Sequence, residues 1–474
     1  MNYLPLFLDL TSKNILIVGG GEVAFNKITL LLKANAKVNV IAKDLCTDVE
    51  NLLHENKITW ISREFDSLFL KKMFLVIAAT NDLKLNQYVF KLCNNRCLFV
   101  NVVDDKSKCS FIFPSIIDRS PIIISLSSGG TAPVLLRLLR EKIESILPMK
   151  LGKVAKISGK WREVVKNSFN SLLARRRFWE KLFKGIFTEH ILNENTEQAT
   201  RILKNTLQEH TLLKGQISLV GAGPGDSGLL TLRGLQVLQQ ADVVLYDRLV
   251  SKDILNLIRR DAKRIYVGKR VGVKTISQEK IIKLLIFLAR QGKRVVRLKG
   301  GDSFIFGRGG EEIEAAKNAD IDFQIIPGIT SAIGISAYTG IPLTHRKYSH
   351  GVVFITGHKY KNNFVNNFSI LCNPFYTLVV YMGTLNAIEI SEKLIMYGRL
   401  KSTPIAIISE GTTMNQKVII GRLDEIKKII HLIKTPSLLI IGEVVLFHEK
   451  LKWFNTNHSF NNIDNISNSI IKLI

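Results

Sequence analysis

Residues 14–24 read Asn-Ile-Leu-Ile-Val-Gly-Gly-Gly-Glu-Val-Ala, and this stretch decides the fold of the first half of the chain. An apolar run typical of a short buried strand gives way to three glycines and then to a helical pattern. The string fits G-x-G-x-x-A: Gly19 permits a tight turn, Gly21 lets a pyrophosphate approach the backbone, and Ala24 lets the helix pack close to the sheet. The pattern predicts a dinucleotide-binding turn. The alternative is a glycine-rich turn without a ligand.

Further strands follow this turn. We expect them over residues 38–41, 74–79 and 98–103, with helical segments between them. Strands that alternate with helices predict a parallel sheet with crossover helices. Asp44 lies just beyond residues 38–41 and could accept a hydrogen bond from a ribose 2′-hydroxyl, which would favour NAD over NADP. The flanking Lys43 weakens that preference.

Asp104 follows the strand predicted over residues 98–103. In an open α/β sheet ligands bind at the carboxyl ends of the strands, so Asp104 could reach a substrate beside the nicotinamide. A carboxylate there could act as a general base or help to hold a divalent metal. Spacing alone favours the alternative, a solvated turn in which Asp104 or Asp105 caps the next segment.

A second loop with possible chemistry lies in the middle of the chain. After a strand predicted over residues 121–126, the sequence Ser-Ser-Gly-Gly-Thr leads into a helix predicted over residues 133–147. This loop could offer amide and hydroxyl groups to an anion. The favoured interpretation is a helix cap, with Thr131 as the capping residue and Pro133 in the first turn.

A second α/β section begins after a basic helical stretch at residues 152–184 and a polar segment at residues 193–215, where we place the main domain boundary. Its first strand, residues 216–220, precedes a loop in which Pro224 and Gly225 would break the helix that a dinucleotide turn requires. Further strands are expected over residues 243–246, 265–267, 295–298, 323–326, 352–356, 378–381, 405–408 and 437–441.

This section has three glycine-rich loops. The loops at residues 221–226 and 299–304 each follow a predicted strand, and the loop at residues 306–312 comes shortly after the second of them. The paired glycines of the second loop would let a ligand approach the backbone, and its Asp302 could bind an amine or a hydroxyl. Three such loops exceed what turns alone require, so we expect a ligand cleft.

Two ionisable residues also stand near strand ends. Asp247 follows residues 243–246, and Lys269 follows residues 265–267. A carboxylate and an ammonium near one cleft could move protons for a substrate. A surface ion pair explains them equally well.

Composition leaves the partner open. The 474 residues hold 66 Lys and Arg against 40 Asp and Glu, a formal net charge of +26, so nucleic acid, an anionic membrane and a polycarboxylate substrate all remain possible. Five scattered cysteines imply no disulfide framework. No apolar run reaches the roughly 18 residues of a membrane helix, and the first residues lack the basic start of a signal peptide. We therefore expect a cytoplasmic protein without a membrane partner.

The ordered motifs resemble the siroheme synthase family over about residues 1–457. The strings that carry the resemblance include LIVGGGEVAFNK, NVVDD, FIFPSIIDRSP, SSGGTAPVL and RRRFWEK, followed by LVGAGPGDSGLLTLRG, VVRLKGGDSFIFGRGGEE, PGITSAIGISAYTGIPLTHR and YMGT. The resemblance implies an α/β fold. Its parts would be an N-terminal Rossmann-like NAD-binding domain (1–113), a dimerisation and helical linker region (114–215), a two-subdomain tetrapyrrole methylase domain (216–457) and a disordered tail (458–474).

The resemblance implies an enzyme with three activities. Methylation of uroporphyrinogen III at C-2 and C-7 by S-adenosylmethionine would give precorrin-2, NAD-dependent dehydrogenation would give sirohydrochlorin, and insertion of Fe²⁺ would give siroheme. It also implies a homodimer that binds tetrapyrrole polycarboxylates and no nucleic acid. Clefts lined by Arg and Lys would suit such substrates.

Carried over residue by residue, the resemblance gives roles to single positions. Asp104 matches a carboxylate that serves dehydrogenation and the transient handling of Fe²⁺. Asp247 matches a proposed proton acceptor, Lys269 a proposed proton donor, and Ser128 a serine that can be phosphorylated. The positions that match cofactor-binding residues are Glu22, Val23, Lys43 and Asp44 for NAD, beside the motif glycines Gly19 and Gly21, and Pro224, Gly300, Gly301, Asp302, Ile305, Thr330, Ser331, Met382 and Gly411 for S-adenosylmethionine.

Two departures and two rival functions stay open. Ser303 stands where the family usually has proline, which would make that loop less rigid, and Asp105 adds a carboxylate that could alter metal handling. One rival is a methylase whose N-terminal half is only a dimerisation scaffold, although Gly19, Gly21 and Asp104 are intact. The other is an RNA methyltransferase of the same superfamily, which the net charge would suit but which would leave the dinucleotide motif without a role.

Overall fold

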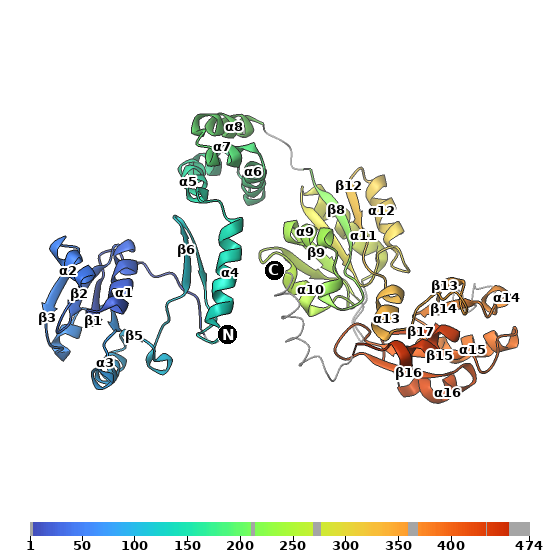
Figure 1. The fold of residues 1–474 in the computed structure, drawn as a ribbon. Helices are drawn as coiled ribbons and strands as arrows, with labels where there is room; N and C mark the ends of the chain where they lie inside the picture. Colours follow the sequence, from blue (N-terminus) through green and yellow to red (C-terminus); the bar gives the residue numbers. More distant parts are fainter. Residues whose placement is uncertain (1–2, 210–213, 269–275, 359–367, 433, 455–474) are drawn as a thin grey trace. The chain divides into compact units, whose positions relative to one another are not determined.

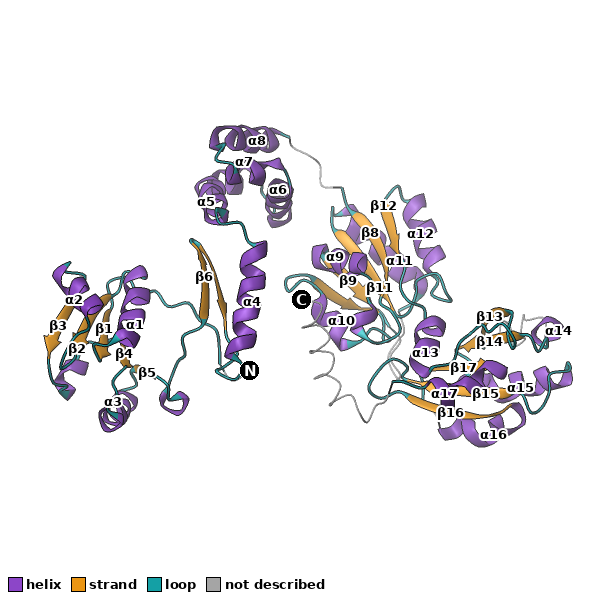
Figure 2. Cartoon of the chain, in the orientation of Figure 1, coloured by secondary structure: helices purple, strands orange, loops and turns teal. Residues whose placement is uncertain are grey.

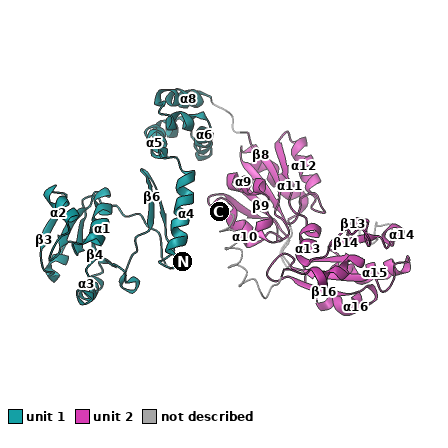
Figure 3. Ribbon diagram, in the orientation of Figure 1, with its two compact units in different colours: residues 1–210 teal, residues 211–474 magenta. Residues whose placement is uncertain are grey.

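The computed structural model describes residues 3–209, 214–268, 276–358, 368–432 and 434–454. The chain divides into two compact units, residues 1–210 and 211–474 (Figure 3). Lys269 and the tail predicted over residues 458–474 lie outside the described residues.

A five-stranded parallel sheet forms the N-terminal part of the first unit (Figure 1). Its strands and helices are β1 (Asn14–Val18), β2 (Lys37–Ile41), β3 (Ile58–Ser62), β4 (Leu75–Ala78), β5 (Phe99–Val102), α1 (Glu22–Lys33), α2 (Thr47–His54) and α3 (Leu83–Asn95). The strand order is β3-β2-β1-β4-β5. Helices α1 and α2 pack on one face through Ile28 and Val49, and α3 packs on the other through Val89. The chain therefore changes faces between β1 and β4, where open α/β sheets bind their ligands.

The strands predicted in this half are confirmed as β1, β2, β4 and β5, each within two residues. Strand β3 was not predicted. Its residues Ile58–Ser62 form an edge strand that is only partly buried and whose register shifts against β2, so it lacks the continuous apolar run of the central strands.

An extension of the first unit follows the sheet. Strands β6 (Ser115–Arg119) and β7 (Ile122–Leu126) pair as an antiparallel hairpin, and α4 (Pro133–Ile146) lies beside β6 (Figure 1). Strand β7 and helix α4 confirm predictions from the sequence, whereas β6 was not predicted. A cluster of helices with its own core around Phe187 and Leu203 comes next. These helices are α5 (Leu151–Ser168), α6 (Leu172–Lys184), α7 (Ile186–Leu192) and α8 (Thr196–Gln208).

The second unit begins with another parallel sheet (Figure 2). Its elements are β8 (Gln216–Gly221), β9 (Val243–Tyr246), β10 (Lys263–Tyr266), β11 (Arg294–Lys299), β12 (Asp322–Ile326), α9 (Leu232–Gln240), α10 (Lys252–Leu257), α11 (Gln278–Arg290) and α12 (Gly309–Asn318). The strand order is β10-β9-β11-β8-β12. Helices α9 and α10 pack on one face, and α11 and α12 on the other.

A mixed sheet in the order β13-β14-β17-β15-β16 completes this unit. Its elements are β13 (Gly351–Thr356), β14 (Tyr376–Tyr381), β15 (Pro404–Ser409), β16 (Lys417–Arg422), β17 (Ser437–Ile441), α13 (Ser331–Thr339), α14 (Phe368–Leu371), α15 (Ala387–Met396), α16 (Ile426–Ile429) and α17 (His448–Leu451). Helix α13, which follows the first sheet, packs on the second through Ala332 and Ile335. Every strand predicted in this half is confirmed. Strand β16, a half-buried edge strand, was missed.

Candidate active sites

The glycine turn between β1 and α1 packs tightly against neighbouring strand ends. Gly19 has a φ of 128°, and a Cβ atom there would lie 2.2 Å from the carbonyl oxygen of Ala79, just beyond β4. A Cβ atom at Gly20 would lie 2.4 Å from the carbonyl oxygen of Asp44, and the Gly20 carbonyl accepts a hydrogen bond from the Cys46 amide at 2.9 Å. Only glycine fits at these two positions.

Gly21 differs from both neighbours. A Cβ atom there would meet no described protein atom within 4 Å. Gly21 is the N-cap of α1, no side chain in the described part of the chain caps it, and the exposed Glu22 and Val23 follow. Open space in front of free helix amides is what a pyrophosphate needs, so these residues fit NAD. The exposed Lys43 and Asp44 stand directly beside this turn, beyond β2.

Asp104 lies at the same edge of the sheet. The amide of Val103 bonds to the carbonyl of Ala78 at 2.9 Å, so Asp104 stands one residue beyond the end of the β4–β5 pair. Its backbone is left-handed, with φ of 61°, and its side chain is exposed. A non-glycine residue in this conformation costs of order 1 kcal/mol, and aspartate adopts it more readily than most residues. The structure thus brings Asp104 and the glycine turn to the same edge of the sheet, at the ends of β5 and β1, with the end of β4 between them.

Asp105 has a different task. Its carboxylate accepts hydrogen bonds from the Ser107 amide at 3.1 Å and from Lys108 Nζ at 2.6 Å. The Lys108 ammonium and the Ser107 hydroxyl hold the pKa of Asp105 below its usual value. The capping alternative therefore describes Asp105, and Asp104 takes no part in it.

Lys27 is a neighbour of Asp104 that sequence analysis did not single out. Its Nζ atom lies 4.4 Å from the centroid of the Phe113 ring. Burial lowers the pKa of Lys27, and the negative charge of Asp104 opposes this shift. The only sequence signal was its position on α1, three residues after Ala24, which places it near the glycine turn.

The Ser128 loop corrects one prediction. The N-cap of α4 is Ala132, and Pro133 opens the helix as expected. Thr131 is not the cap, because its hydroxyl donates to the Ser128 carbonyl at 2.7 Å, while the Ser128 hydroxyl accepts from the Ala132 amide at 3.2 Å. Gly129 and Gly130 both have positive φ, which turns the loop back on itself.

Four glycines bring the loops of the first sheet of the second unit into close contact. A Cβ atom at Gly328 would lie 2.5 Å from the Gly301 carbonyl oxygen and 2.7 Å from the Gly221 backbone. Gly301 also pairs with Gly223 through two backbone hydrogen bonds of 3.1 and 2.7 Å. The loops after β8, β11 and β12 therefore meet at one edge of the sheet.

Asp302 ties these loops together. Its Oδ1 accepts a hydrogen bond from the Phe304 amide at 2.8 Å, and its Oδ2 accepts one from the Gly328 amide at 2.9 Å. Each carboxylate oxygen keeps a second lone pair. Asp302 can therefore shape the loop and still accept from a ligand. The half-buried Ile305 follows in the same loop.

The remaining predicted positions come from α13 and the second sheet. The buried Thr330 hydroxyl bonds to the Tyr381 hydroxyl at 2.7 Å, which also accepts from the Ala332 amide at 3.0 Å. Burial raises the pKa of Tyr381. Ser331 lies beside Gly301, whose added Cβ atom would stand 3.6 Å from the serine hydroxyl.

Pro224, Met382 and Gly411 border the same region. Met382, directly after β14, is exposed and has a φ of 52°. The Gly411 carbonyl would lie 3.1 Å from a Cβ atom at Gly225, so the loop after β15 meets the loop that holds Pro224. The structure thus brings the described positions predicted for S-adenosylmethionine together between the two sheets of this unit.

Asp247 lies at the carboxyl end of β9, beside the loop after β11. Its Oδ1 accepts a hydrogen bond from the Leu249 amide at 3.1 Å, and its Oδ2 lies 3.7 Å from Arg297 Nη2. A Cβ atom at Gly300 would meet the Leu249 Cβ at 2.6 Å. The ion pair that sequence analysis considered for Asp247 exists, but its partner is a buried arginine rather than a surface group. The predicted partner Lys269 lies outside the described residues.

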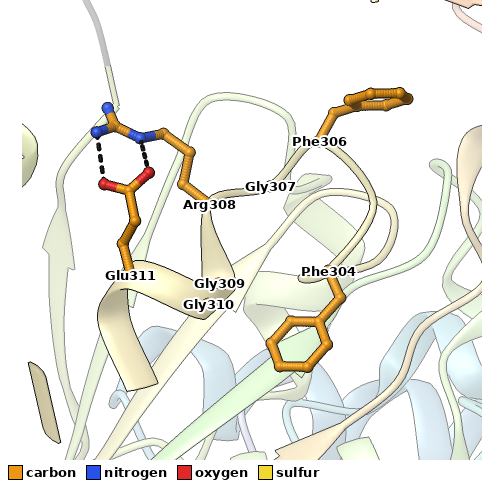
Figure 4. A pocket seen from close by; sticks show the side chains of 7 residues that line it. All are labelled: Phe304, Phe306, Gly307, Arg308, Gly309, Gly310 and Glu311. Atoms are coloured by element: carbon orange, nitrogen blue, oxygen red, sulfur yellow. Dashed lines mark hydrogen bonds and ion pairs between the residues drawn. The ribbon is translucent and has the colours of Figure 1, made fainter. Parts of the chain in front are cut away.

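An open pocket of about 430 Å³ lies along the loop into α12 (Figure 4). Arg308 Nε and Nη2 bond to Glu311 Oε1 and Oε2 at 2.8 and 2.7 Å, and the rings of Phe304 and Phe306 lie on the other side of the pocket. Arg308 holds a left-handed φ of 58° as the N-cap of α12. The fork of the Arg308 guanidinium is therefore already engaged by Glu311, and the two exposed rings supply the apolar side of the pocket.

Two features are absent from the described ranges. No group of three or more His, Cys, Asp or Glu side chains there could hold a metal ion. Likewise, no helix of the described chain is long and apolar enough to cross a membrane.

These sites define a class of protein: a dinucleotide-binding unit joined to a two-sheet methylase. Three family descriptions match the chain: Putative NAD(P)-binding at residues 6–115, Sirohaem synthase dimerisation region at residues 150–207, and Tetrapyrrole (Corrin/Porphyrin) Methylases at residues 216–427.

The chain is also similar to named proteins along its whole length. Siroheme synthase of Buchnera aphidicola subsp. Acyrthosiphon pisum (strain APS) is 69% identical over 98% of both chains, and that of Blochmanniella floridana is 52% identical over 96% of this chain and 99% of its own. Among solved structures, uroporphyrin III C-methyltransferase from Thermus thermophilus is 38% identical, with a TM-score of 0.43, over 49% of this chain and 99% of its own. The chain belongs to the siroheme synthase family, and the predicted family and fold class are confirmed.

Proposed function

We propose that this chain converts uroporphyrinogen III to siroheme in three steps. The second unit would methylate C-2 and C-7 to give precorrin-2, and the first unit would dehydrogenate precorrin-2 to sirohydrochlorin and insert Fe²⁺. One observation carries the proposal. Each unit has charged or glycine-rich loops at the carboxyl ends of parallel strands, with Asp104 in one unit and with Gly301 and Asp247 in the other, and this arrangement supports the proposal.

In the methylase unit, S-adenosylmethionine would supply an electrophilic methyl group when bound. Gly301 and Asp302 would bind and orient it, and the Thr330–Tyr381 hydrogen bond would keep the opposite wall in place. Transfer from a sulfonium depends on alignment more than on acid strength. Asp247 would then accept the proton that the methylated carbon loses. The donor role of Lys269 stays a prediction from the family resemblance.

In the first unit, NAD would supply the hydride acceptor when bound. The free amides at Gly21 and Glu22 would hold its pyrophosphate, and Asp44 would accept from its ribose. Asp104 would take the proton that accompanies dehydrogenation. In the last step Asp104 would take protons from the pyrrole nitrogens as the substrate Fe²⁺ enters.

The chain has a dimerisation region, and we propose that it forms a homodimer in the cytoplasm. Helix α4 supports this, because none of its residues is buried. Its exposed side chains include Val134, Leu135, Leu138, Leu139 and Ile146. Apolar surface of this kind marks a protein interface. Phosphorylation of the half-buried Ser128 stays a prediction.

A stepwise spectroscopic assay tests the proposal. The purified protein receives uroporphyrinogen III and S-adenosylmethionine, then NAD, then Fe²⁺. We expect precorrin-2, sirohydrochlorin and siroheme to appear in that order. A stop at precorrin-2 would make the first unit a scaffold. No methylation would contradict the proposal and favour RNA as the substrate.

A further inference from the structure

Charged side chains are buried beneath the Asp247 loop. Arg297 and Lys299 follow the buried Val295 at alternate positions of β11, on the face that packs against α11 and α12. Glu312 projects from α12. The exposed fractions are 4% for Arg297, 5% for Lys299 and 1% for Glu312. Buried ions are costly, and an apolar set of the same volume is often as stable, so stability alone does not explain the cluster.

Glu312 fixes Arg297 in place. Its Oε1 accepts from Arg297 Nε at 3.2 Å, from Lys299 Nζ at 3.2 Å and from Gln278 Nε2 at 2.9 Å. Arg297 Nη1 donates to the carbonyls of Leu245 and Leu298 at 3.4 and 3.1 Å. With these atoms engaged, Nη2 is the nitrogen of the guanidinium that faces Asp247.

Asp247 completes the charge balance of the cluster. Arg297 and Lys299 are two cations, and Glu312 alone supplies one negative charge. Burial and repulsion from Arg297 lower the pKa of Lys299, whereas Glu312 and Asp247 oppose this shift. Of the four side chains, that of Asp247 is 25% exposed and the others 6% or less. Asp247 is therefore the member that can reach a substrate.

The two oxygens of Asp247 have different contacts, a hydrogen bond at 3.1 Å on Oδ1 and an ion pair at 3.7 Å on Oδ2. The Leu249 amide bonds to Oδ1, and Arg297 faces Oδ2. Leu249 in turn packs against Gly300, so the carboxylate is fixed next to the loop predicted to bind S-adenosylmethionine.

We propose that Arg297, anchored by Glu312, is a positioning residue that aims the Asp247 carboxylate at the methylated carbon of the substrate. The inference rests on the proposed function of Asp247. The planar guanidinium can hold two carboxylates in fixed directions, which an ammonium cannot do. A misplacement of about 1 Å in a reacting group can lower a rate by on the order of 10²-fold.

The test uses the full-length protein and four variants: Arg297→Met, Arg297→Lys, Asp247→Asn and the double variant Arg297→Met/Asp247→Asn. Methyl transfer to uroporphyrinogen III gives kcat and KM, and calorimetry gives the Kd of S-adenosylmethionine. We expect Arg297→Met to lower kcat by on the order of 10²-fold, with KM and Kd unchanged. Arg297→Lys should recover part of kcat. In the Asp247→Asn background, Arg297→Met should have no further effect.

Arg297→Met leaves Glu312 with fewer partners and could weaken the fold. The charge-balanced variant Arg297→Met/Glu312→Met addresses this. We expect its thermal midpoint to recover while kcat stays low. Recovery of kcat in this variant would overturn the inference. The inference would also be overturned if Arg297→Met lowered kcat by the same factor in the wild-type and in the Asp247→Asn background. A fully active Asp247→Asn would overturn the proposed role of Asp247 itself, and an inactive wild-type protein would overturn the proposed methylase function.

Discussion

Asp104 in the first unit and Asp247 in the second both follow a parallel strand, yet their surroundings differ. Asp104 is exposed, stands on left-handed backbone and has a half-buried lysine as its charged neighbour. Asp247 accepts a backbone hydrogen bond at one oxygen, and its other oxygen forms an ion pair with the buried Arg297, which is paired in turn with Glu312. The position of the Asp104 carboxylate is set by its local backbone, whereas the position of the Asp247 carboxylate is set in part by side chains from β11 and α12.

This difference fits the two proposed tasks. A carboxylate that serves both dehydrogenation and metal insertion must meet two substrates, and an exposed side chain can do so. A carboxylate that removes one proton from one carbon gains from a fixed direction. Substitutions at the two sites should therefore fail in different ways.

Asp104→Asn should have the largest effect. We expect dehydrogenation and Fe²⁺ insertion to fall by roughly 10²- to 10⁴-fold, because the proton acceptor is lost, while methyl transfer stays unchanged. Asp105→Asn is the matched control, since Asp105 caps a short helix. It should keep all three rates and lose about 1 kcal/mol of stability at most. Equal losses in both variants would contradict the separate roles.

Gly328→Ala should disrupt the second site through packing. Its Cβ atom would lie 2.5 Å from the Gly301 carbonyl oxygen. We expect about 3 kcal/mol of destabilisation in the second unit and loss of methyl transfer, with NAD binding retained. Thermal unfolding and NAD titration measure both. Gly310→Ala, where a Cβ atom meets nothing within 4 Å, is the stability control and should leave the thermal midpoint unchanged or higher.

The parts of the structure that could be predicted share one property: each is specified by a short stretch of consecutive residues. Residues 14–24 predicted β1, the glycine turn and α1, and the ordered motifs predicted which loops would meet around Gly301. The Arg297–Glu312 pair joins residues from different elements, and nothing in either local sequence marks them as partners. Thr131 was mistaken for a cap because capping depends on where its hydroxyl points, which the sequence does not contain.

Gly21→Asp should separate ligand binding from folding. The added side chain points into space that no described protein atom fills, and an aspartate at the N-cap stabilises a helix. We expect NAD affinity to fall by at least about tenfold through repulsion of the pyrophosphate, with thermal stability unchanged or higher. Gly19→Ala should do the reverse and destabilise the first unit, because its Cβ atom would meet Ala79. Unchanged NAD affinity in Gly21→Asp would contradict the assigned site.

Ser303→Pro should have the smallest effect, and it should stabilise. Ser303 is fully buried, and within the described part of the chain its hydroxyl has no hydrogen-bond partner. No described hydrogen bond uses its amide, so proline removes a buried hydroxyl and restricts the unfolded chain. We expect a gain of about 0.5–1 kcal/mol in the free energy of unfolding. Ser303→Ala isolates the hydroxyl contribution, and a lower thermal midpoint in Ser303→Pro would show that the loop needs its present conformation.

A mixing experiment tests the central claim, that two independent sites in one chain act in series. Asp247→Asn and Asp104→Asn proteins are assayed apart and together with uroporphyrinogen III, S-adenosylmethionine, NAD and Fe²⁺. Alone, Asp247→Asn should make no precorrin-2, and Asp104→Asn should stop at precorrin-2. Together they should form siroheme, because each supplies the site that the other lacks. Failure of the mixture to pass precorrin-2, with the wild-type protein active, would contradict independent sites.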